Sequence, residues 1–231
     1  MLSDIRVVIA SPHPRHDSME VTLRERLGVE VLRVRNPSVL NFSILTNFSP
    51  QFVFFPHWSW KVPAEIYEGF ECVIFHMTNL PFGRGGSPLQ NLIVRGVSET
   101  QLTALRCVEA LDAGPVYLKR PLLLLGTAEE ILLRTSKLTE EMIESIVREQ
   151  PIAQPQVGEP TIFHRRTPQD GNIAQLKTLE EVHDFIRMLD ADGYPRAFLE
   201  INNLRLEFSR SSVKADHLFA DVIIKEISRE K

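Results

Sequence analysis

The stretch IRVVIASPHPRHDSMEVTLRERLGVEVLRV, residues 5–34, decides the fold. Residues 5–10 form an apolar run rich in β-branched side chains, which predicts a buried strand. After a break at residues 11–14, residues 17–27 predict a helix with Gly28 just past its end. Residues 29–34 predict a second strand. The order strand, helix, strand predicts a parallel sheet with crossover helices.

Further along the chain, residues 51–55 and 71–75 predict two more buried strands, joined by a helix at 63–70. His57 and His76 follow these strands closely. Ligands of open parallel sheets bind at the carboxyl ends of the strands. Both histidines are therefore candidate site residues before any motif is considered.

The rest of the chain predicts a helix at 88–96, strands at 101–108 and 116–125, and two helices capped by Thr127 and Thr139. A Pro-, Gln- and Gly-rich linker at 150–172 precedes a helix at 179–190 and strands at 197–201, 204–208 and 217–224. We expect an α/β protein. Residues 1–150 would form a Rossmann-like core, with a mainly parallel sheet and helices on both faces. Residues 151–231 would form a linker and a small α+β extension.

The bulk composition is that of a water-exposed globular chain: 231 residues, 43% hydrophobic and 24% charged, with a net charge of -4. A dedicated nucleic-acid binder usually has a basic face, so nucleic acid is not expected as a partner. The two cysteines are too few for a disulfide framework. The first residues lack the layout of a signal peptide, and no apolar stretch is long enough to span a membrane. We expect a cytoplasmic protein without a membrane partner.

Two segments could carry chemistry. HMTNLPFGRGGSP, residues 76–88, has three glycines at 83, 85 and 86, which let a backbone approach a ligand closely. Its spacing is not that of a P-loop. LDAGP, residues 111–115, is typical of a turn. By itself, the first segment is as readily an ordinary mobile loop as a ligand-binding one. The second is more readily a structural turn than a functional site.

Taken together, the two segments resemble the signature of the folate-dependent formyltransferase family. In that family, His-Pro-Ser-Leu-Leu-Pro precedes a basic, glycine-containing loop, and a Leu-Asp-Thr-Gly turn follows; the resemblance covers residues 1–150 and is densest from 72 to 116. It implies formyl transfer from 10-formyltetrahydrofolate without a metal, with His76 and Asp112 as catalytic residues. The residues that it implies for folate binding are Leu80, Pro81, Phe82, Gly83, Arg84, Gly85, Ala113, Gly114 and Pro115.

One position departs from the family pattern. The family has an Asn two residues before the His, and here that position is Ile74. The resemblance implies that the Asn helps to hold the formyl oxygen. Another donor could replace it, and the candidates are His57, Ser59, Asn79 and Asn91. Alternatively, the chain is an inactive binding protein that has kept the formyltransferase fold.

The formyl acceptor is the last question. The short part after the core and the net negative charge of the whole chain disfavour methionyl-tRNA as the acceptor, and a glycine-free loop at 11–16 disfavours a ribonucleotide. Residues 75–78, 81–91, 186–190 and 193–195 resemble sugar N-formyltransferases of pseudaminic and related nonulosonic acid pathways. This resemblance implies a nucleotide-linked amino sugar, a UDP-linked 4-amino-4,6-dideoxy sugar, as acceptor and partner. Its binding residues would be Asn79, Arg165, Arg166, Arg187 and Tyr194. The C-terminal strands leave a homodimer open.

Overall fold

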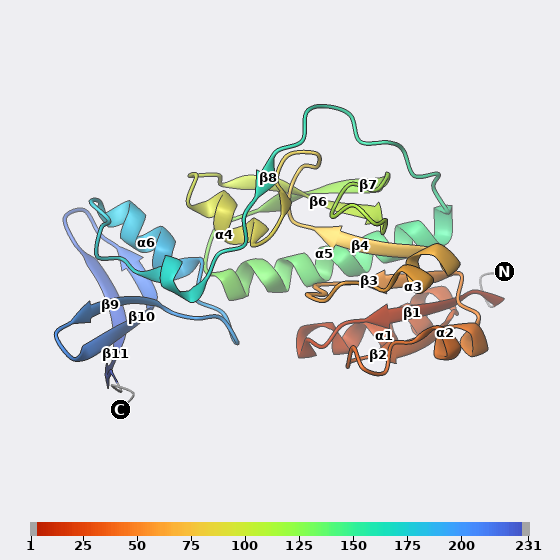
Figure 1. Ribbon diagram of the computed structural model, residues 1–231, viewed down its shortest axis with the longest axis horizontal. Coiled ribbons are helices and arrows are strands. Elements are labelled where there is room, and N and C mark those ends of the chain that lie inside the picture. The colour runs from red at the N-terminus through yellow and green to blue at the C-terminus, as the bar shows by residue number, and fades with distance from the viewer. Residues whose placement is uncertain (1–3, 228–231) are drawn as a thin grey trace. The chain divides into compact units, whose positions relative to one another are not determined.

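The computed structural model describes residues 4–227 and contains a six-stranded sheet in the order β2-β1-β3-β4-β6-β7 (Figure 1). β1 pairs in parallel with β2 and β3, and β3 with β4, whereas β4 and β6 are antiparallel. The strands are β1 (Arg6–Ala10), β2 (Glu30–Val34), β3 (Phe52–Phe55), β4 (Cys72–His76), β6 (Glu99–Arg106) and β7 (Val116–Leu123). The predicted α/β fold with a mainly parallel sheet is confirmed.

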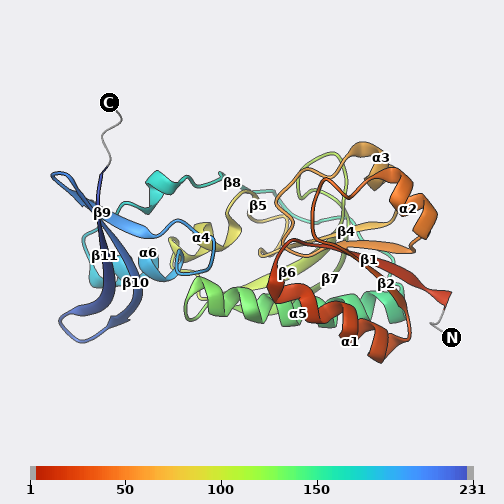
Figure 2. The ribbon, with the colours of Figure 1, turned by 90° about the horizontal axis from the view of Figure 1, so that it is seen from below.

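Helices cover both faces of this sheet (Figure 2). α1 (Asp17–Leu27) and α5 (Ala128–Glu149) bury Leu23 and Ile143 against Val7 and Ile9 on one face. α2 (Phe42–Phe48) and α3 (Ala64–Gly69) pack an apolar cluster onto the other face. Alternate residues of each buried strand enter opposite clusters, as the period of two in a strand requires.

α5 corrects the prediction of two helices. It runs without a break for 22 residues. Thr139, which we expected to cap a second helix, is only 2% exposed in the middle of α5. Leu132, Thr139, Met142 and Ile146 recur at helical spacing and are all buried, so one apolar stripe continues past the local capping signal. Among the described residues, no helix combines the length and the apolar character needed to cross a membrane.

α2 was not predicted from the sequence. It begins at the N-cap Asn41, whose side chain accepts a hydrogen bond from the backbone N–H of Ile44. The segment 150–172 is largely irregular, as expected. It contains β8 (Ile162–Phe163), which pairs with β5 (Arg84–Gly85), and the short 3-10 helix η3 (Pro168–Gly171). Another 3-10 helix, η2 (Pro14–His16), precedes α1.

The chain divides into two compact units, the second comprising 86–99, 123–132 and the residues from 163 onward. The second unit holds α4 (Pro88–Ile93), α6 (Leu179–Arg187) and a sheet in the order β11-β10-β9. Its strands are β9 (Ala197–Ile201), β10 (Leu204–Val213) and β11 (Leu218–Glu226). Thr178 and Glu181 form the predicted capping box of α6.

Candidate active site

His76 is the last residue of β4, where its side chain is held from two sides. Alternation along the strand puts it on the same face as Ile74. The ring is nearly buried, at 7% exposure. Its Nε2–H donates to the Gly83 carbonyl at 2.8 Å, and its Nδ1 lies 3.6 Å from Oδ2 of Asp112. The structure thus brings the two predicted catalytic side chains together.

Asp112 lies in the turn between β6 and β7, in the left-handed conformation with φ 52°. Its Oδ2 accepts a hydrogen bond from the backbone N–H of Gly85 at 2.9 Å. A Cβ at Gly114 would overlap the Arg106 carbonyl oxygen, so only glycine fits the turn there. The Asp112 carboxylate therefore contacts both the glycine-containing loop and His76.

The loop after β4 is anchored at its start and open at its tip. Thr78 is fully buried, and its carbonyl accepts a hydrogen bond from Thr103 Oγ1 at 2.7 Å. Gly83 and Gly85 have φ of 75° and 106°, which other residues rarely adopt. Between them and the anchor, the ring of Phe82 is 39% exposed. A flat ligand could therefore meet an aromatic surface next to the His76–Asp112 pair.

Sequence reasoning missed two side chains that contact this loop. Lys119 donates to Oδ1 of Asn79 at 2.6 Å and to the Leu80 carbonyl, and burial lowers the pKa of its amine. Gln156 bonds to Arg84 and to the backbone of the Asp112 turn. Neither residue belongs to a motif, so no sequence signal marked it. Within residues 4–227, no three His, Cys, Asp or Glu side chains are grouped so that they could hold a metal ion.

Ile74, which stands in place of the family Asn, also lies in apolar surroundings. Ile74 packs against the cluster that contains Val53 and Phe55. Asn91, one of the four proposed substitutes, is occupied elsewhere: its amide donates to the carbonyls of Gly86, Ser87 and His164 at 2.9–3.1 Å. Its two N–H groups are therefore committed to holding a loop.

His57, another proposed substitute, belongs to a group of histidines after β1 and β3. Its ring lies 4.2 Å from that of His13. Burial, followed by the charges of His13 and Arg15, lowers the pKa of His57 to about 3. A neutral imidazole at pH 7 can still donate one hydrogen bond. Ser59 and Asn79, the remaining two, are exposed side chains.

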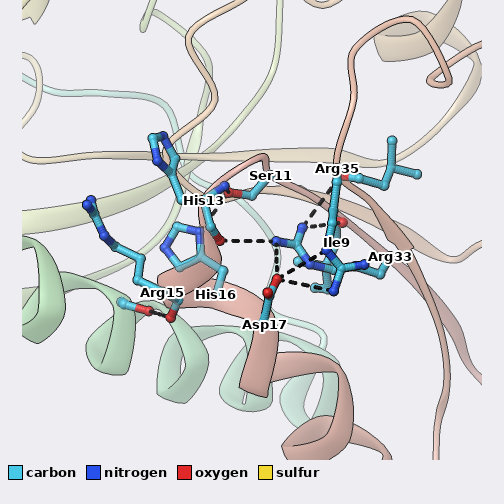
Figure 3. Close-up of polar contacts among 10 residues, drawn as sticks. Ile9, Ser11, His13, Arg15, His16, Asp17, Arg33 and Arg35 are labelled. Atoms are coloured by element: carbon cyan, nitrogen blue, oxygen red, sulfur yellow. Dashed lines mark hydrogen bonds and ion pairs between the residues drawn. The ribbon is translucent and has the colours of Figure 1, made fainter. Parts of the chain in front are cut away.

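The loop after β1 is braced by a buried guanidinium (Figure 3). Arg33 donates to the carbonyls of Ile9 at 3.1 Å and His13 at 3.4 Å, and it lies 3.5 Å from Asp17. Ser11 Oγ lies 2.7 Å from Nδ1 of His16, whose pKa burial and neighbouring positive groups lower to about 3. Side chains therefore hold this glycine-free loop in place.

The residues predicted for sugar binding, apart from Asn79, lie in the second unit. The guanidinium of Arg187 donates to Asp184 and to the carbonyls of Leu124 and Gly126, so it ties α6 to the chain before α5. Arg166 lies over the ring of Phe185 and donates to the Asp170 carbonyl. Arg165 is exposed and Tyr194 half-buried. Arg166 and Arg187 thus have local structural partners.

The structure thus contains a buried His–Asp pair at the carboxyl end of β4, beside a glycine-containing loop. The formyltransferase resemblance implied these two residues as the catalytic pair. The Clostridium thermocellum methionyl-tRNA formyltransferase is 43% identical, with a TM-score of 0.93 over 96% of this chain and 99% of that chain. The Clavibacter michiganensis subsp. michiganensis methionyl-tRNA formyltransferase is 28% identical over 147 residues, 61% of this chain and 48% of that protein. The family model for the methionyl-tRNA formyltransferase C-terminal domain matches residues 168–225.

The chain belongs to the formyltransferase family, whose members are N-formyltransferases. It spans about half the length of the first curated relatives that it matches.

The sugar-type resemblance is weaker. The formyltransferase PseJ from Anoxybacillus kamchatkensis, solved with a UDP-linked formamido sugar and tetrahydrofolate, is 16% identical. Its TM-score is 0.58 over 78% of this chain and 97% of that chain. Such a likeness shows a shared fold alone.

The expected partners are therefore corrected. A nucleotide-linked amino sugar as partner and the exclusion of nucleic acid were both wrong, because the similar proteins above are named for methionyl-tRNA. The exclusion rested on the net charge of the whole chain. A net charge does not describe the potential of one face, which is what a nucleic acid meets.

Proposed function

We propose that this chain transfers a formyl group from 10-formyltetrahydrofolate to the amino group of methionyl-tRNA. One observation carries the acceptor: the likeness to a methionyl-tRNA formyltransferase extends over nearly the whole of both chains. In this proposal, residues 1–150 hold the catalytic core and residues 151–231 form the extension.

Formyl transfer needs a hydrogen-bond donor for the formyl oxygen and an acceptor for the proton that the amine loses. An amine that attacks a formyl carbon leaves negative charge on the carbonyl oxygen and must lose a proton. The bond from that carbon to the donor nitrogen must then break, and the departing nitrogen takes up a proton. His76 would turn its Nε2–H away from the Gly83 carbonyl, which it contacts at 2.8 Å, and donate a hydrogen bond to the formyl oxygen. Asp112 would orient the His76 ring and accept the proton, directly or through water. The Asp112 carboxylate is held by the backbone N–H of Gly85, which reduces the reorganisation required of it.

The residues around the pair suit a folate. 10-Formyltetrahydrofolate would supply the formyl group when bound. The half-exposed Phe82 ring offers a stacking surface, and Gly83, Gly85, Ala113 and Gly114 carry no bulky side chain. Arg84 would attract the negatively charged end of the ligand. We propose Leu80, Pro81, Phe82, Gly83, Arg84, Gly85, Ala113, Gly114 and Pro115 as the folate-binding set.

Ile74 favours a second candidate, a protein that binds folate without transferring formyl groups. Its apolar side chain cannot hold a formyl oxygen, and Asn91 is occupied. The two candidates predict different rates of formyl transfer but the same binding of folate.

The test measures folate binding and formyl transfer separately. Tetrahydrofolate should raise the thermal midpoint of the protein, because a ligand that binds only the native state stabilises it. Transfer is measured with a formyl-labelled donor and methionyl-tRNA, with uncharged tRNA as the control. Label on methionyl-tRNA alone supports the enzyme. Stabilisation without transfer supports the binding protein. If the protein shows neither stabilisation nor transfer, the proposal fails.

A further inference from the structure

Gln156 lies outside both motifs, in the irregular segment after α5. Its Nε2 donates to the carbonyls of Asp112 and Gly114, both at 2.8 Å. Its Oε1 accepts from Nε and Nη2 of Arg84 at 3.1 and 2.8 Å. The amide thus uses both of its N–H groups and its carbonyl oxygen. One side chain links the glycine-containing loop to the aspartate turn.

The backbone around Gln156 is fixed to the same two segments. On one side, Gln154 and Val116 exchange N–H to carbonyl bonds of 2.7 and 2.8 Å, directly after the aspartate turn. On the other side, Thr161 accepts from the N–H of Arg84 at 2.9 Å and donates to the Pro81 carbonyl at 3.2 Å. Because both ends are anchored, the Gln156 amide has a defined place between the loop and the turn.

We infer that Gln156 is a positioning residue for the formyl transfer proposed above, and the inference rests on that function. The two segments that it joins lie 72 and 44 residues away in the sequence. The backbone of Asp112 is in a left-handed conformation, and its carboxylate must stay within reach of His76. By holding the Asp112 carbonyl, Gln156 sets the orientation of the carboxylate. By holding Arg84, it sets the direction of a cation proposed to meet the folate.

Two substitutions separate these roles. Gln156→Leu removes both sets of hydrogen bonds. Gln156→Glu keeps an acceptor for Arg84 but has no N–H to donate, and its charge faces the carbonyls of Asp112 and Gly114. The first variant should therefore lower kcat and raise the KM for folate, each by about tenfold for roughly 1.4 kcal/mol. The second should lower kcat by about tenfold and leave the KM for folate within about twofold.

Gln154→Ala is the matched control, since its exposed side chain donates to the Ile152 carbonyl at the surface. The full chain is assayed for initial rates with methionyl-tRNA over a range of 10-formyltetrahydrofolate concentrations, and the thermal midpoint of each variant is recorded. We expect the Leu and Glu variants to differ in their KM for 10-formyltetrahydrofolate, while their folded fraction equals that of the control. A purely structural role would lower both midpoints and leave kcat and KM per folded molecule unchanged.

The inference is overturned if the wild type transfers formyl groups and both Gln156 variants match Gln154→Ala in kcat and KM. Absence of transfer by both the wild type and Gln154→Ala is a different failure. It removes the proposed function, and with it the reaction that Gln156 would support.

Discussion

Replacing Asp112 by Asn should abolish most of the turnover while leaving the fold intact. Asn is among the residues that tolerate a positive φ, and the backbone at 112 has φ 52°. Its side-chain oxygen can still accept the hydrogen bond that Gly85 donates at 2.9 Å. The change therefore removes a negative charge and a proton acceptor while retaining the shape.

The magnitude follows from these two effects. A positioned general base contributes about 10²- to 10⁴-fold in rate, or roughly 2.7–5.4 kcal/mol of transition-state stabilisation. The hydrogen bond to Gly85 becomes neutral and loses about 1 kcal/mol, which lowers the thermal midpoint of a chain of this size by roughly 2–4 °C. Asp112→Ala should cost more stability, because Ala cannot accept the bond and is less suited to this φ.

The assay compares initial rates of formyl transfer and thermal unfolding for the wild type and both variants. We expect Asn and Ala to reduce the rate alike and to differ in stability. A rate for Asp112→Asn within about threefold of the wild type would refute the role of Asp112 as proton acceptor, since the expected loss is at least about 10²-fold.

Three further substitutions, one of them with a matched control, test the architecture around the site. Gly114→Ala should cost more than about 4 kcal/mol or prevent folding, because its Cβ would overlap the Arg106 carbonyl oxygen; Gly96→Ala, with no neighbour within 4 Å, should cost only about 1 kcal/mol, as measured by denaturant unfolding. Ile74→Asn should lower stability by about 1–3 kcal/mol without raising turnover, because it puts an amide against an apolar cluster; a gain in kcat would show that position 74 limits catalysis. His57, whose pKa falls from 6.5 to about 3, stays neutral in the folded state, so its contribution to the unfolding free energy is complete above pH 6.5 and is lost as the pH falls toward 3. His57→Gln should make that loss shallower in unfolding measured across this range, and an identical slope would count against a buried neutral ring.

The core of the fold could be predicted because its signals are local and repeated. The apolar runs that became β1, β3 and β4 are short and bounded by turn residues, and Gly28 ends α1 with a φ of 68°. α2 was not predicted, because no strong helical period follows its N-cap Asn41 and only Leu45 is buried in that helix.

α5 was divided in error because a local signal was given more weight than a longer pattern. Thr139 followed by acidic residues resembles a helix start. Tertiary packing overrides that preference, since the residue lies on the buried stripe of the helix. Counting the apolar spacing across residues 128–149 would have predicted a single helix.

The candidate site was predictable only where a motif carries it. His76 and Asp112 stood in recognisable segments, and the structure places their side chains 3.6 Å apart. Gln156 had no such signal, because its role depends on two segments distant in sequence being brought to the same place. Arg187 shows the opposite case: a conspicuous charged residue whose guanidinium is bound to Asp184 and to backbone carbonyls.

The identity of the formyl acceptor, methionyl-tRNA, is the central proposal and can be measured directly. The protein is incubated with 10-formyltetrahydrofolate and methionyl-tRNA, the tRNA is digested with nuclease, and the methionyl-adenosine is analysed by mass spectrometry beside a His76→Ala control. With the wild type we expect the mass of one added formyl group on the methionyl amine, and with the control a loss of this product of at least about 10²-fold. Unmodified methionyl-adenosine from a folded wild-type preparation that tetrahydrofolate stabilises would contradict this assignment.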